Sequence, residues 1–303
     1  MRIASTQYHA TMNTALQTAS TRLQDILQKM ASGERYSLPS ESPIANVRLS
    51  RLTREEAALD QYLDNIATLQ GRLTKNESLL SGMSSDMLSA RDLLVWAADG
   101  GNTSEDVAAV ASSLQPLIDS LLYSANSTDA EGRFLFSGTA VDTATIAYDP
   151  AAAIGSRYAA AGNSMEQLVA VASAVTQPSN VVLPEMADIM NQLDLALATL
   201  TAPNVNVNDP AVRAVLRAAL NGIDQGIETN SGKMASLGGA QNILTTLQNN
   251  HTNVSLSNKQ AALVIGQLDY GDAAVKLNGY TASVEATQKA YAQISKLSLF
   301  DAL

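Results

Sequence analysis

The residues of this 303-residue chain whose spacing comes nearest to a site of known chemistry are three alternating asparagines. Asn204, Asn206 and Asn208 follow the spacing of the first ligands of a calcium-binding loop. Such a loop also needs a glycine at its sixth position and a bidentate glutamate at its twelfth, but the sixth is not glycine and the twelfth is Val215. We therefore interpret the segment as an asparagine-rich linker before a helix, and we predict no metal site.

The sequence also lacks the motifs of cysteine sites, histidine sites and phosphate-binding loops. The chain has no cysteine, which excludes thiolate metal sites and cysteine nucleophiles, and it has only two histidines. His9 lies on an apolar stripe and is predicted to be a packing residue, whereas His251 lies in a polar stretch and is predicted to be solvated. The pairs Gly100–Gly101 and Gly238–Gly239 lack the rest of a nucleotide fingerprint, so both are predicted to end helices. We expect no catalytic residue, no cofactor and no enzyme.

The residues that do repeat with a regular period are apolar, and they lie at both ends of the chain. Near the N-terminus they are His9, Met12, Leu16, Ala19, Leu23, Ile26 and Met30, and near the C-terminus Tyr270, Ala273, Leu277, Tyr280, Val284, Thr287, Tyr291 and Ile294. Spacings of three and four are those of a helix that packs against a partner helix. We expect the two stripes to pair with each other and to complete their burial against neighbouring subunits. The candidate interface residues are Met12, Leu16, Leu23, Ile26, Met30, Leu277, Tyr280, Val284, Tyr291 and Ile294.

The pattern between the two stripes predicts a mainly α fold, a long antiparallel helical hairpin or coiled-coil rod with paired termini. A long helix is predicted to begin at Pro43, capped by Ser42, and to end before Asp99–Asn102. The helical period is lost between Arg133 and about Glu185, where short apolar segments at 168–171 and 180–183 indicate a small β-rich insert at the bend. Helices resume near Pro184 and after Asp209, with breaks expected at Gly238–Gly239 and at 266–271.

Three domains follow from this organisation. Residues 1–44 with 260–303 are predicted to form a terminal coiled-coil assembly domain, and residues 45–137 with 186–259 a helical rod domain. The β-rich insert at 138–185 is predicted to form a small outer domain. Aromatic residues make up 4% of the chain, which is typical of thin helical packing and low for a compact enzyme core.

The net charge of −10 is concentrated in the middle of the chain. The ends, 1–44 and 258–303, carry eight basic against seven acidic residues, and residues 45–257 carry eleven against twenty-two. An acidic middle argues against binding to nucleic acid or to anionic membranes, because both need clustered Lys and Arg. No apolar run approaches the roughly 18 residues that span a bilayer, and the opening residues lack the apolar core of a cleavable signal peptide.

Four segments of this sequence resemble the flagellar hook-associated junction proteins, within the wider flagellin-like group. They are the opening Met1–Thr6, the turn Ser32–Arg35 followed by Pro43, the segment Ala125–Thr139 and the ending Lys296–Leu303. The ending is the most specific of them and differs from the usual flagellin ending. The turn departs from the family, which commonly has two aspartates before the proline where this chain has Glu41 and Ser42. The resemblance covers about residues 1–139 and 230–303.

The resemblance implies a structural adaptor at the hook–filament junction, outside the cell, exported unfolded through the flagellar type III apparatus. The implied partners are further copies of the chain in a tubular ring, the preceding hook-associated protein, flagellin and an export chaperone. It also places Leu299 and Phe300, at the characteristic ending, among the candidate assembly residues.

Two alternatives remain open at this point. The segment Ser236–Asn242 is closer to flagellin, which favours a filament subunit. A type III secreted coiled-coil binding protein or adhesin-like protein would also have long amphipathic helices around an insert.

Overall fold

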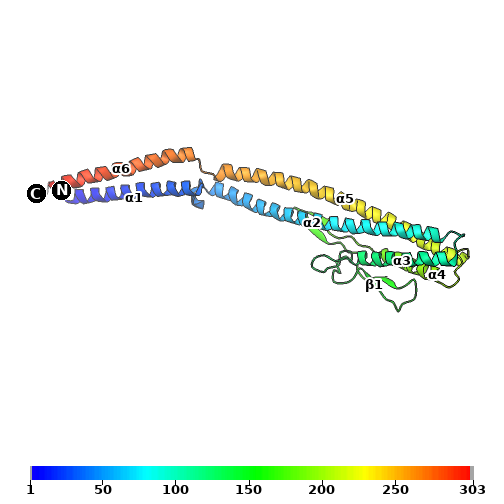
Figure 1. The fold of residues 1–303 in the computed structure, drawn as a ribbon. Coiled ribbons are helices and arrows are strands. Elements are labelled where there is room, and N and C mark those ends of the chain that lie inside the picture. Colours follow the sequence, from blue (N-terminus) through cyan, green and yellow to red (C-terminus); the bar gives the residue numbers. More distant parts are fainter. Residues whose placement is uncertain (1, 301–303) are drawn as a thin grey trace. The chain divides into compact units, whose positions relative to one another are not determined.

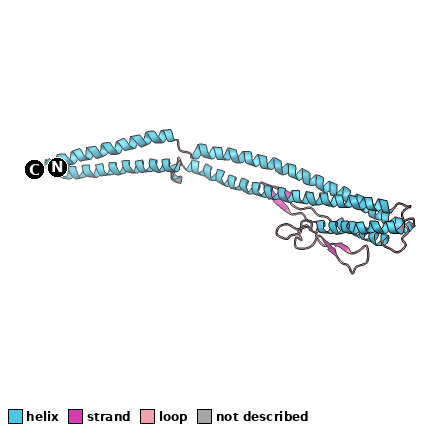
Figure 2. Ribbon diagram, viewed as in Figure 1, coloured by secondary structure: helices cyan, strands magenta, loops and turns pink. Residues whose placement is uncertain are grey.

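The computed structural model describes the backbone of residues 2–300, and the side chains of residue 7 and residues 9–293. Six helices dominate this part of the chain, and four short strands accompany them (Figures 1 and 2). The helices are α1 (Arg2–Ser32), α2 (Pro43–Ala97), α3 (Ser104–Ala125), α4 (Met186–Leu200), α5 (Pro210–Gly266) and α6 (Tyr270–Phe300), with a 3-10 turn at Pro39–Glu41. The strands are β1 (Ile146–Tyr148), β2 (Tyr158–Ala160), β3 (Leu168–Ala172) and β4 (Val175–Pro178). The prediction of a mainly α fold with a small β-rich insert is confirmed.

The chain forms two compact units. Unit 1 comprises Met1–Leu59 and Thr252–Leu303, and unit 2 comprises Asp60–His251. In unit 1, α1 lies beside α6, so the first and the last helix of the chain pair with each other, as Figure 1 shows. The beginning of α2 and the end of α5 complete this unit. The division into three domains stays a prediction.

Unit 2 has a continuous apolar core to which α2, α3, α4 and α5 all contribute. The α2 residues that enter it recur at helical spacing along the chain: Ile66, Leu69, Leu73, Leu80, Met83, Met87, Ala90 and Leu94. Removing such side chains from water stabilises the fold by roughly 1.5–3 kcal/mol for each large one. The stripe also contains Asn76, which is fully buried, and across the seam Asn230 of α5 donates to the Leu80 carbonyl at 2.6 Å and to Ser84 Oγ at 2.7 Å.

Truncating a leucine of this core should destabilise unit 2 strongly. Leu80→Ala is expected to lower the free energy of unfolding by about 2–5 kcal/mol, because Leu80 is fully buried and the loss leaves a cavity. Leu88→Ala is the matched control on the same helix, since Leu88 is 49% exposed, and it should change stability by less than about 0.5 kcal/mol. Urea unfolding followed by far-UV circular dichroism measures both; equal losses would contradict the assignment of the core.

The break between α2 and α3 is set by a capping box. Thr103 Oγ1 accepts a hydrogen bond from the Asp106 amide at 3.2 Å, and the Asp106 carboxylate accepts one from the Thr103 amide at 3.0 Å. The two interactions satisfy backbone donors that have no partner in the first turn of a helix. Hydrogen bonds from Thr103 also hold the pKa of Asp106 below its ordinary value. Helix α3 therefore begins directly after Thr103, and the predicted end of the long helix before Asp99–Asn102 is confirmed.

The insert consists of two antiparallel hairpins, and α4 fixes the first of them in unit 2. In the β1–β2 hairpin Ile146 pairs with Ala160, and Tyr148 with Tyr158. Asn191 of α4 accepts from the Tyr158 amide at 2.9 Å and donates to its carbonyl at 2.7 Å. Burial, together with the nearby Asp194 carboxylate, raises the pKa of Tyr158 to about 12. The first hairpin is thus bonded to a helix that follows it in the sequence.

Of the two short apolar segments that indicated the β-rich insert, 168–171 lies in a strand and 180–183 does not. The latter segment runs beside the second hairpin, in which β3 pairs with β4, without a ladder of its own. Side-chain hydrogen bonds replace the ladder: Asn180 accepts from the Gln167 amide at 2.7 Å and donates to the Met165 carbonyl at 3.1 Å. Its apolar residue Leu183 is buried in the core of unit 2.

The predicted helix break at Gly238–Gly239 is wrong, because α5 continues through both glycines. A glycine in a helix interior costs only about 1 kcal/mol relative to alanine, and buried apolar residues on both sides outweigh that cost. Leu237 is 5% exposed and Leu244 is fully buried, so the apolar stripe carries on past the pair. The other predicted interruption is present, since α5 ends at Gly266 and α6 begins at Tyr270.

His251 is held by the fold, so the prediction of a solvated side chain is wrong. Its Nε2 lies 2.8 Å from the Val171 carbonyl oxygen, which can only accept, so the ring donates. The imidazole also stacks on Tyr62, with ring centroids 5.6 Å apart. Together with Asn65, which donates to the Ala170 carbonyl at 2.8 Å, His251 fastens strand β3 to the long helices of unit 2.

Among the described residues, none of the helices combines the length and the apolar character that crossing a membrane requires.

Candidate assembly interface

The candidate interface residues whose side chains the structure describes lie along the seam between α1 and α6. The helices are antiparallel: His9 meets Tyr291 edge-to-face at 5.6 Å, and the Tyr270 hydroxyl donates to the Met30 carbonyl at 3.2 Å. Ile26 is 6% exposed, and the partly buried seam residues are Met12, Leu16, Leu23, Met30, Leu277, Tyr280 and Val284. Tyr291 is 36% exposed at the edge of the seam. The side chains of Ile294, Leu299 and Phe300 lie outside the described residues.

This seam buries far less than the core of unit 2. Among the described side chains of α1 and α6, only Ala19, Ile26 and Ala273 fall in the buried class. Around the rest of their circumference both helices have mainly polar residues and alanines, and among their exposed residues are Leu27 of α1 and Val275 of α6. Because most helical stability in proteins comes from packing of an apolar face, a two-helix seam of this kind is marginal by itself. Further helices packed against this seam would bury more of its surface.

The two helix breaks of unit 1 are bonded to each other. Glu34 and Gln267 form an antiparallel bridge, in which the Arg35 amide donates to the Gly266 carbonyl at 2.7 Å and the Leu268 amide to the Gly33 carbonyl at 2.9 Å. Gly33 has φ of +74°, a conformation that favours glycine. The pairing keeps the breaks after α1 and after α5 in register, so α6 begins where α1 has just ended.

An ion-pair cluster holds the turn between α1 and α2. Lys29 Nζ lies 3.0 Å from Asp25 and 2.8 Å from Glu41, whose carboxylate also accepts from Ser37 at 2.8 Å. Burial alone would lower the pKa of Lys29, but the hydrogen bonds to Glu41 and Asp25 outweigh it and raise that pKa. Hydrogen bonds from Lys29 and Ser37 hold the pKa of Glu41 below its ordinary value. The departure from the usual family turn at Glu41 thus has a structural role in this chain.

The turn should therefore loosen in acid. A carboxyl whose pKa is lowered in the folded state stabilises that state fully above its unfolded pKa, near 4.5, and loses the contribution as the pH falls through the lowered value. We expect the amides of residues 36–42 to lose protection from hydrogen exchange as the pH falls below about 4.5, after correction for the intrinsic rate. Glu41→Gln should remove both the protection at neutral pH and its pH dependence. Glu34→Gln is the control, and an identical change there would contradict the assignment to Glu41.

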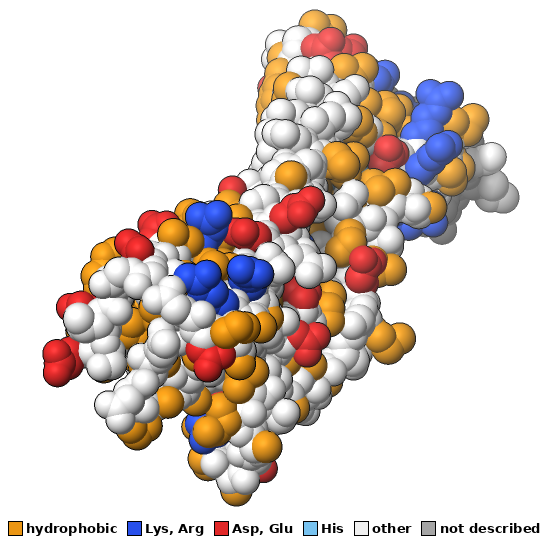
Figure 3. All heavy atoms as spheres, turned by 90° about the vertical axis from the view of Figure 1, so that its right-hand side faces the viewer, with side chains coloured by type: hydrophobic (Ala, Val, Ile, Leu, Met, Phe, Trp, Pro, Cys, Tyr) orange, Lys and Arg blue, Asp and Glu red, His pale blue; other side chains and the backbone are white. Residues whose placement is uncertain are grey.

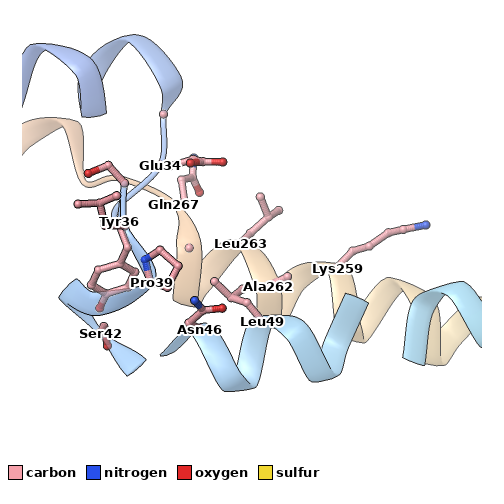
Figure 4. Close-up of a pocket in the computed structure, with 14 residues that line it drawn as sticks. Glu34, Tyr36, Pro39, Ser42, Asn46, Leu49, Lys259, Ala262, Leu263 and Gln267 are labelled. Carbon is pink, nitrogen blue, oxygen red and sulfur yellow. The ribbon is translucent and has the colours of Figure 1, made fainter. Parts of the chain in front are cut away.

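A groove of about 860 Å³ opens beside this turn (Figure 4). Its apolar wall is made by Tyr36, Leu38 and Pro39 of the turn, Leu49 of α2, and Ala262 and Leu263 of α5. In Figure 4 the side chain of Lys259 extends along α5 away from the other labelled residues. Leu38, which lines the groove, is 60% exposed, and three hydrophobic side chains of α2 and α5 that do not line it are exposed as well: Ile44 at 71%, Val47 at 68% and Val264 at 80%. Sequence periodicity missed this surface, because these residues interrupt or flank the stripes.

The numbers of basic and acidic residues differ between the two units. Unit 1 contains eleven Lys and Arg against nine Asp and Glu, and unit 2 contains eight against twenty. On the face shown in Figure 3, Lys and Arg side chains gather in a few small groups, and neutral, hydrophobic and acidic side chains cover the remainder. No group of three or more His, Cys, Asp or Glu side chains able to hold a metal ion occurs among the described residues.

Comparison with known proteins identifies relatives along most of the chain. The family model of the bacterial flagellin N-terminal helical region matches residues 3–141. Over 290 residues, 90% of each chain, the protein is 25% identical to flagellar hook-associated protein 3 of Escherichia coli (strain K12).

Solved structures give the same answer. A Vibrio parahaemolyticus protein assigned as a flagellar hook-associated protein is 32% identical, with a TM-score of 0.67, over 74% of this chain and 99% of that one. The flagellar junction protein FlgL of Legionella pneumophila shares the fold, with a TM-score of 0.55 at 12% identity over 72% of this chain and 100% of that one. This chain belongs to the flagellar hook-associated protein 3 family, within the flagellin-like group.

Proposed function

We propose that this protein is a structural adaptor of the bacterial flagellum, which joins the hook side to the first flagellin subunits of the filament. The observation that carries the proposal is the match to hook-associated protein 3 over 90% of both chains. It is supported by the α1–α6 seam, whose shallow burial suits helices that become stable on packing against further subunits. The proposed site of action is the hook–filament junction, outside the cell.

The proposed mechanism is folding coupled to assembly. Fixing the backbone of one residue costs about 1–2 kcal/mol, and a single shared apolar seam offsets this cost poorly over two 31-residue helices. Neighbouring copies, the preceding hook-associated protein and flagellin would each bury more of α1 and α6. The C-terminal heptad region, around Tyr270 to Ile294, is where an export chaperone would shield apolar surface of the unassembled chain. The function requires neither catalysis nor a cofactor.

Electron microscopy of flagella from a strain deleted for this gene tests the proposal. Hooks without filaments, and flagellin shed into the medium, are expected. Restoration of attached filaments by the intact gene is the control. Unaltered flagella in the deletion strain would overturn the proposal and favour a secreted binding protein.

The same experiment separates the adaptor from a flagellin. A filament subunit would leave the junction intact, so its loss would produce short or absent filaments without shedding of flagellin. The specific ending Lys296–Leu303 favours the adaptor, whereas Ser236–Asn242 is closer to flagellin.

A further inference from the structure

Helix α2 has two exposed faces, one near each end, in which large apolar side chains lie beside charged ones. The charged side chains are mainly basic in the first face and acidic in the second. Two faces of a single helix cannot pack against each other, so if they meet they join separate copies of the chain. We propose that the basic face at the beginning of α2 in one copy docks against the acidic face at the end of α2 in a second copy. The inference deepens the proposed function, because it names a contact through which the copies associate.

The basic face lies in unit 1 and consists of Ile44, Val47, Arg48, Arg51 and Arg54. At 100° per residue these positions fall within an arc of about 120° on the helix surface, which also contains the exposed Glu55, so the face has three basic side chains against one acidic one. All five are exposed, and Ile44 and Val47 rank among the most exposed large hydrophobic side chains of the described part. Arg54 donates to the Ser50 carbonyl at 3.3 Å, and none of the three arginines has an ion-pair partner among the described residues.

The acidic face lies in unit 2 and consists of Leu88, Asp92, Val95 and Trp96, with Asp99 just past the helix end. Leu88 and Val95 are each 49% exposed, and Trp96, the one tryptophan of the sequence, is 47% exposed. Their spacing of seven, with Asp92 between them, places them on one side of the helix. Asp92 has no ion-pair partner in the described part of the chain. Like the first face, this one combines large apolar side chains with charged side chains, but its charged side chains are acidic.

Charge complementarity selects a second copy as the partner. Unit 2 has twelve more acidic than basic residues, whereas unit 1 has two more basic than acidic, so the long-range field favours contact between unlike units of separate copies. A nucleic acid or an anionic membrane could pair with three arginines, but the acidic surface of unit 2 would repel either one. Exposed tryptophan and arginine are also the residues that most often dominate protein interfaces.

A contact between two different surfaces of the chain allows many copies to join one after another. The two faces are different surfaces of the same chain, so each copy can offer both at once. Interfaces of this unlike, head-to-tail kind generate rings or helical tubes, whereas an interface of one surface with itself stops at a dimer. Each face has only four or five side chains, which is small beside the roughly 800 Å² per partner of a stable interface. A pair of copies should therefore associate weakly and become stable only when many such contacts form together.

Disulfide cross-linking tests the contact in the full-length chain, and the absence of native cysteine leaves introduced thiols as the only reactive ones. Chains carrying Val47→Cys are mixed with chains carrying Val95→Cys at high protein concentration and low salt, and mixed cross-links are counted. The matched control is Ala57→Cys, an exposed α2 position about 60° outside the basic face. We expect at least about tenfold more cross-linking of Val95→Cys to Val47→Cys than to Ala57→Cys. Equal yields would overturn the proposal.

Charge reversal then tests the pairing itself. Arg51→Glu in the first chain should lower the yield about tenfold, and Asp92→Arg in the second chain should restore it. The emission of Trp96 should shift to shorter wavelength as the concentration of the unmodified chain rises, but not in Arg51→Glu. Failure of Asp92→Arg to restore the yield would overturn the charge pairing. Circular dichroism checks that these surface variants remain folded.

Failure of the proposed α2 contact can be distinguished from failure of the proposed adaptor function. If the Arg51→Glu chain still attaches filaments as firmly as the unmodified chain, the proposed α2 contact is wrong. The adaptor role is not affected by that result. Unaltered flagella in the deletion strain would instead remove the adaptor role, while cross-linking of the purified chain would still decide whether the contact exists.

Discussion

Replacing Ile26 by aspartate is expected to detach the filament from the hook. Ile26 is 6% exposed and lies in the seam between α1 and α6, so the variant replaces a buried apolar side chain of the seam by a carboxylate. Burial of an unpaired charge costs several kcal/mol, more than a marginal two-helix seam can absorb. Cells that carry the variant should shed flagellin and lose swimming motility, which soft-agar assays and electron microscopy measure.

Leu27→Asp is the matched control for this experiment. It adds the same charge one residue further along the same helix, but Leu27 is 48% exposed, so the carboxylate stays in water. Leu27→Asp should leave motility near that of the unmodified chain, and Leu23→Asp, at a partly buried seam position, should resemble Ile26→Asp. Unit 2 should unfold at the same temperature in all three variants. Equal motility of the Ile26 and Leu27 variants would show that the seam has no part in assembly.

The sequence predicts the helices of this fold because helical periodicity is a local signal. The α2 stripe holds a three-four spacing from Leu59 to Leu94, and its apolar residues from Ile66 onward are all buried. The start of α2 is predictable for the same reason, since Ser42 and Pro43 act within one turn. The pairing of α1 with α6 follows from two stripes that each need a partner.

The predictions that failed depend on contacts between residues far apart in the sequence. Gly238 and Gly239 break a helix in isolation, but Leu237 and Leu244 on either side are anchored in the core of unit 2. His251 lies in a polar stretch, and only the fold brings the Val171 carbonyl to its ring. Tertiary packing overrides local propensity in such cases, and no periodicity in the sequence reveals it.

The candidate interface is predictable only in part. The seam residues come directly from the heptads, whereas the cluster of Lys29 with Asp25 and Glu41 joins two segments across a turn. The bridge between Glu34 and Gln267 joins breaks more than 200 residues apart, and the sequence marks each break without pairing them. One signal for the exposed basic face was available, namely three arginines at intervals of three on α2.

Hydrogen exchange should reveal a large difference in stability between the terminal helices and unit 2. In dilute, unassembled chain, the amides of α1 and α6 are expected to exchange with protection below about a hundredfold. Those of the α2 and α5 segments in unit 2 should be protected more than about ten-thousandfold. The physical reason is burial: α1 and α6 place three described side chains in the buried class, and unit 2 has a continuous core drawn from four helices. Mass spectrometry of exchanged peptides measures both regions in one sample.

The same measurement on assembled structures should show that α1 and α6 become more protected. If neighbouring copies bury the outer faces of α1 and α6, protection of these helices should rise by at least about a hundredfold in purified hook–filament structures, while that of unit 2 changes little. Ile26→Asp should lower the protection of α1 further in the unassembled chain, whereas Leu27→Asp should leave it unchanged. Strong protection of α1 and α6 in the dilute chain would mean that the terminal helices are stable before assembly. Coupled folding would then be the wrong mechanism, and the seam would act as a preformed docking surface.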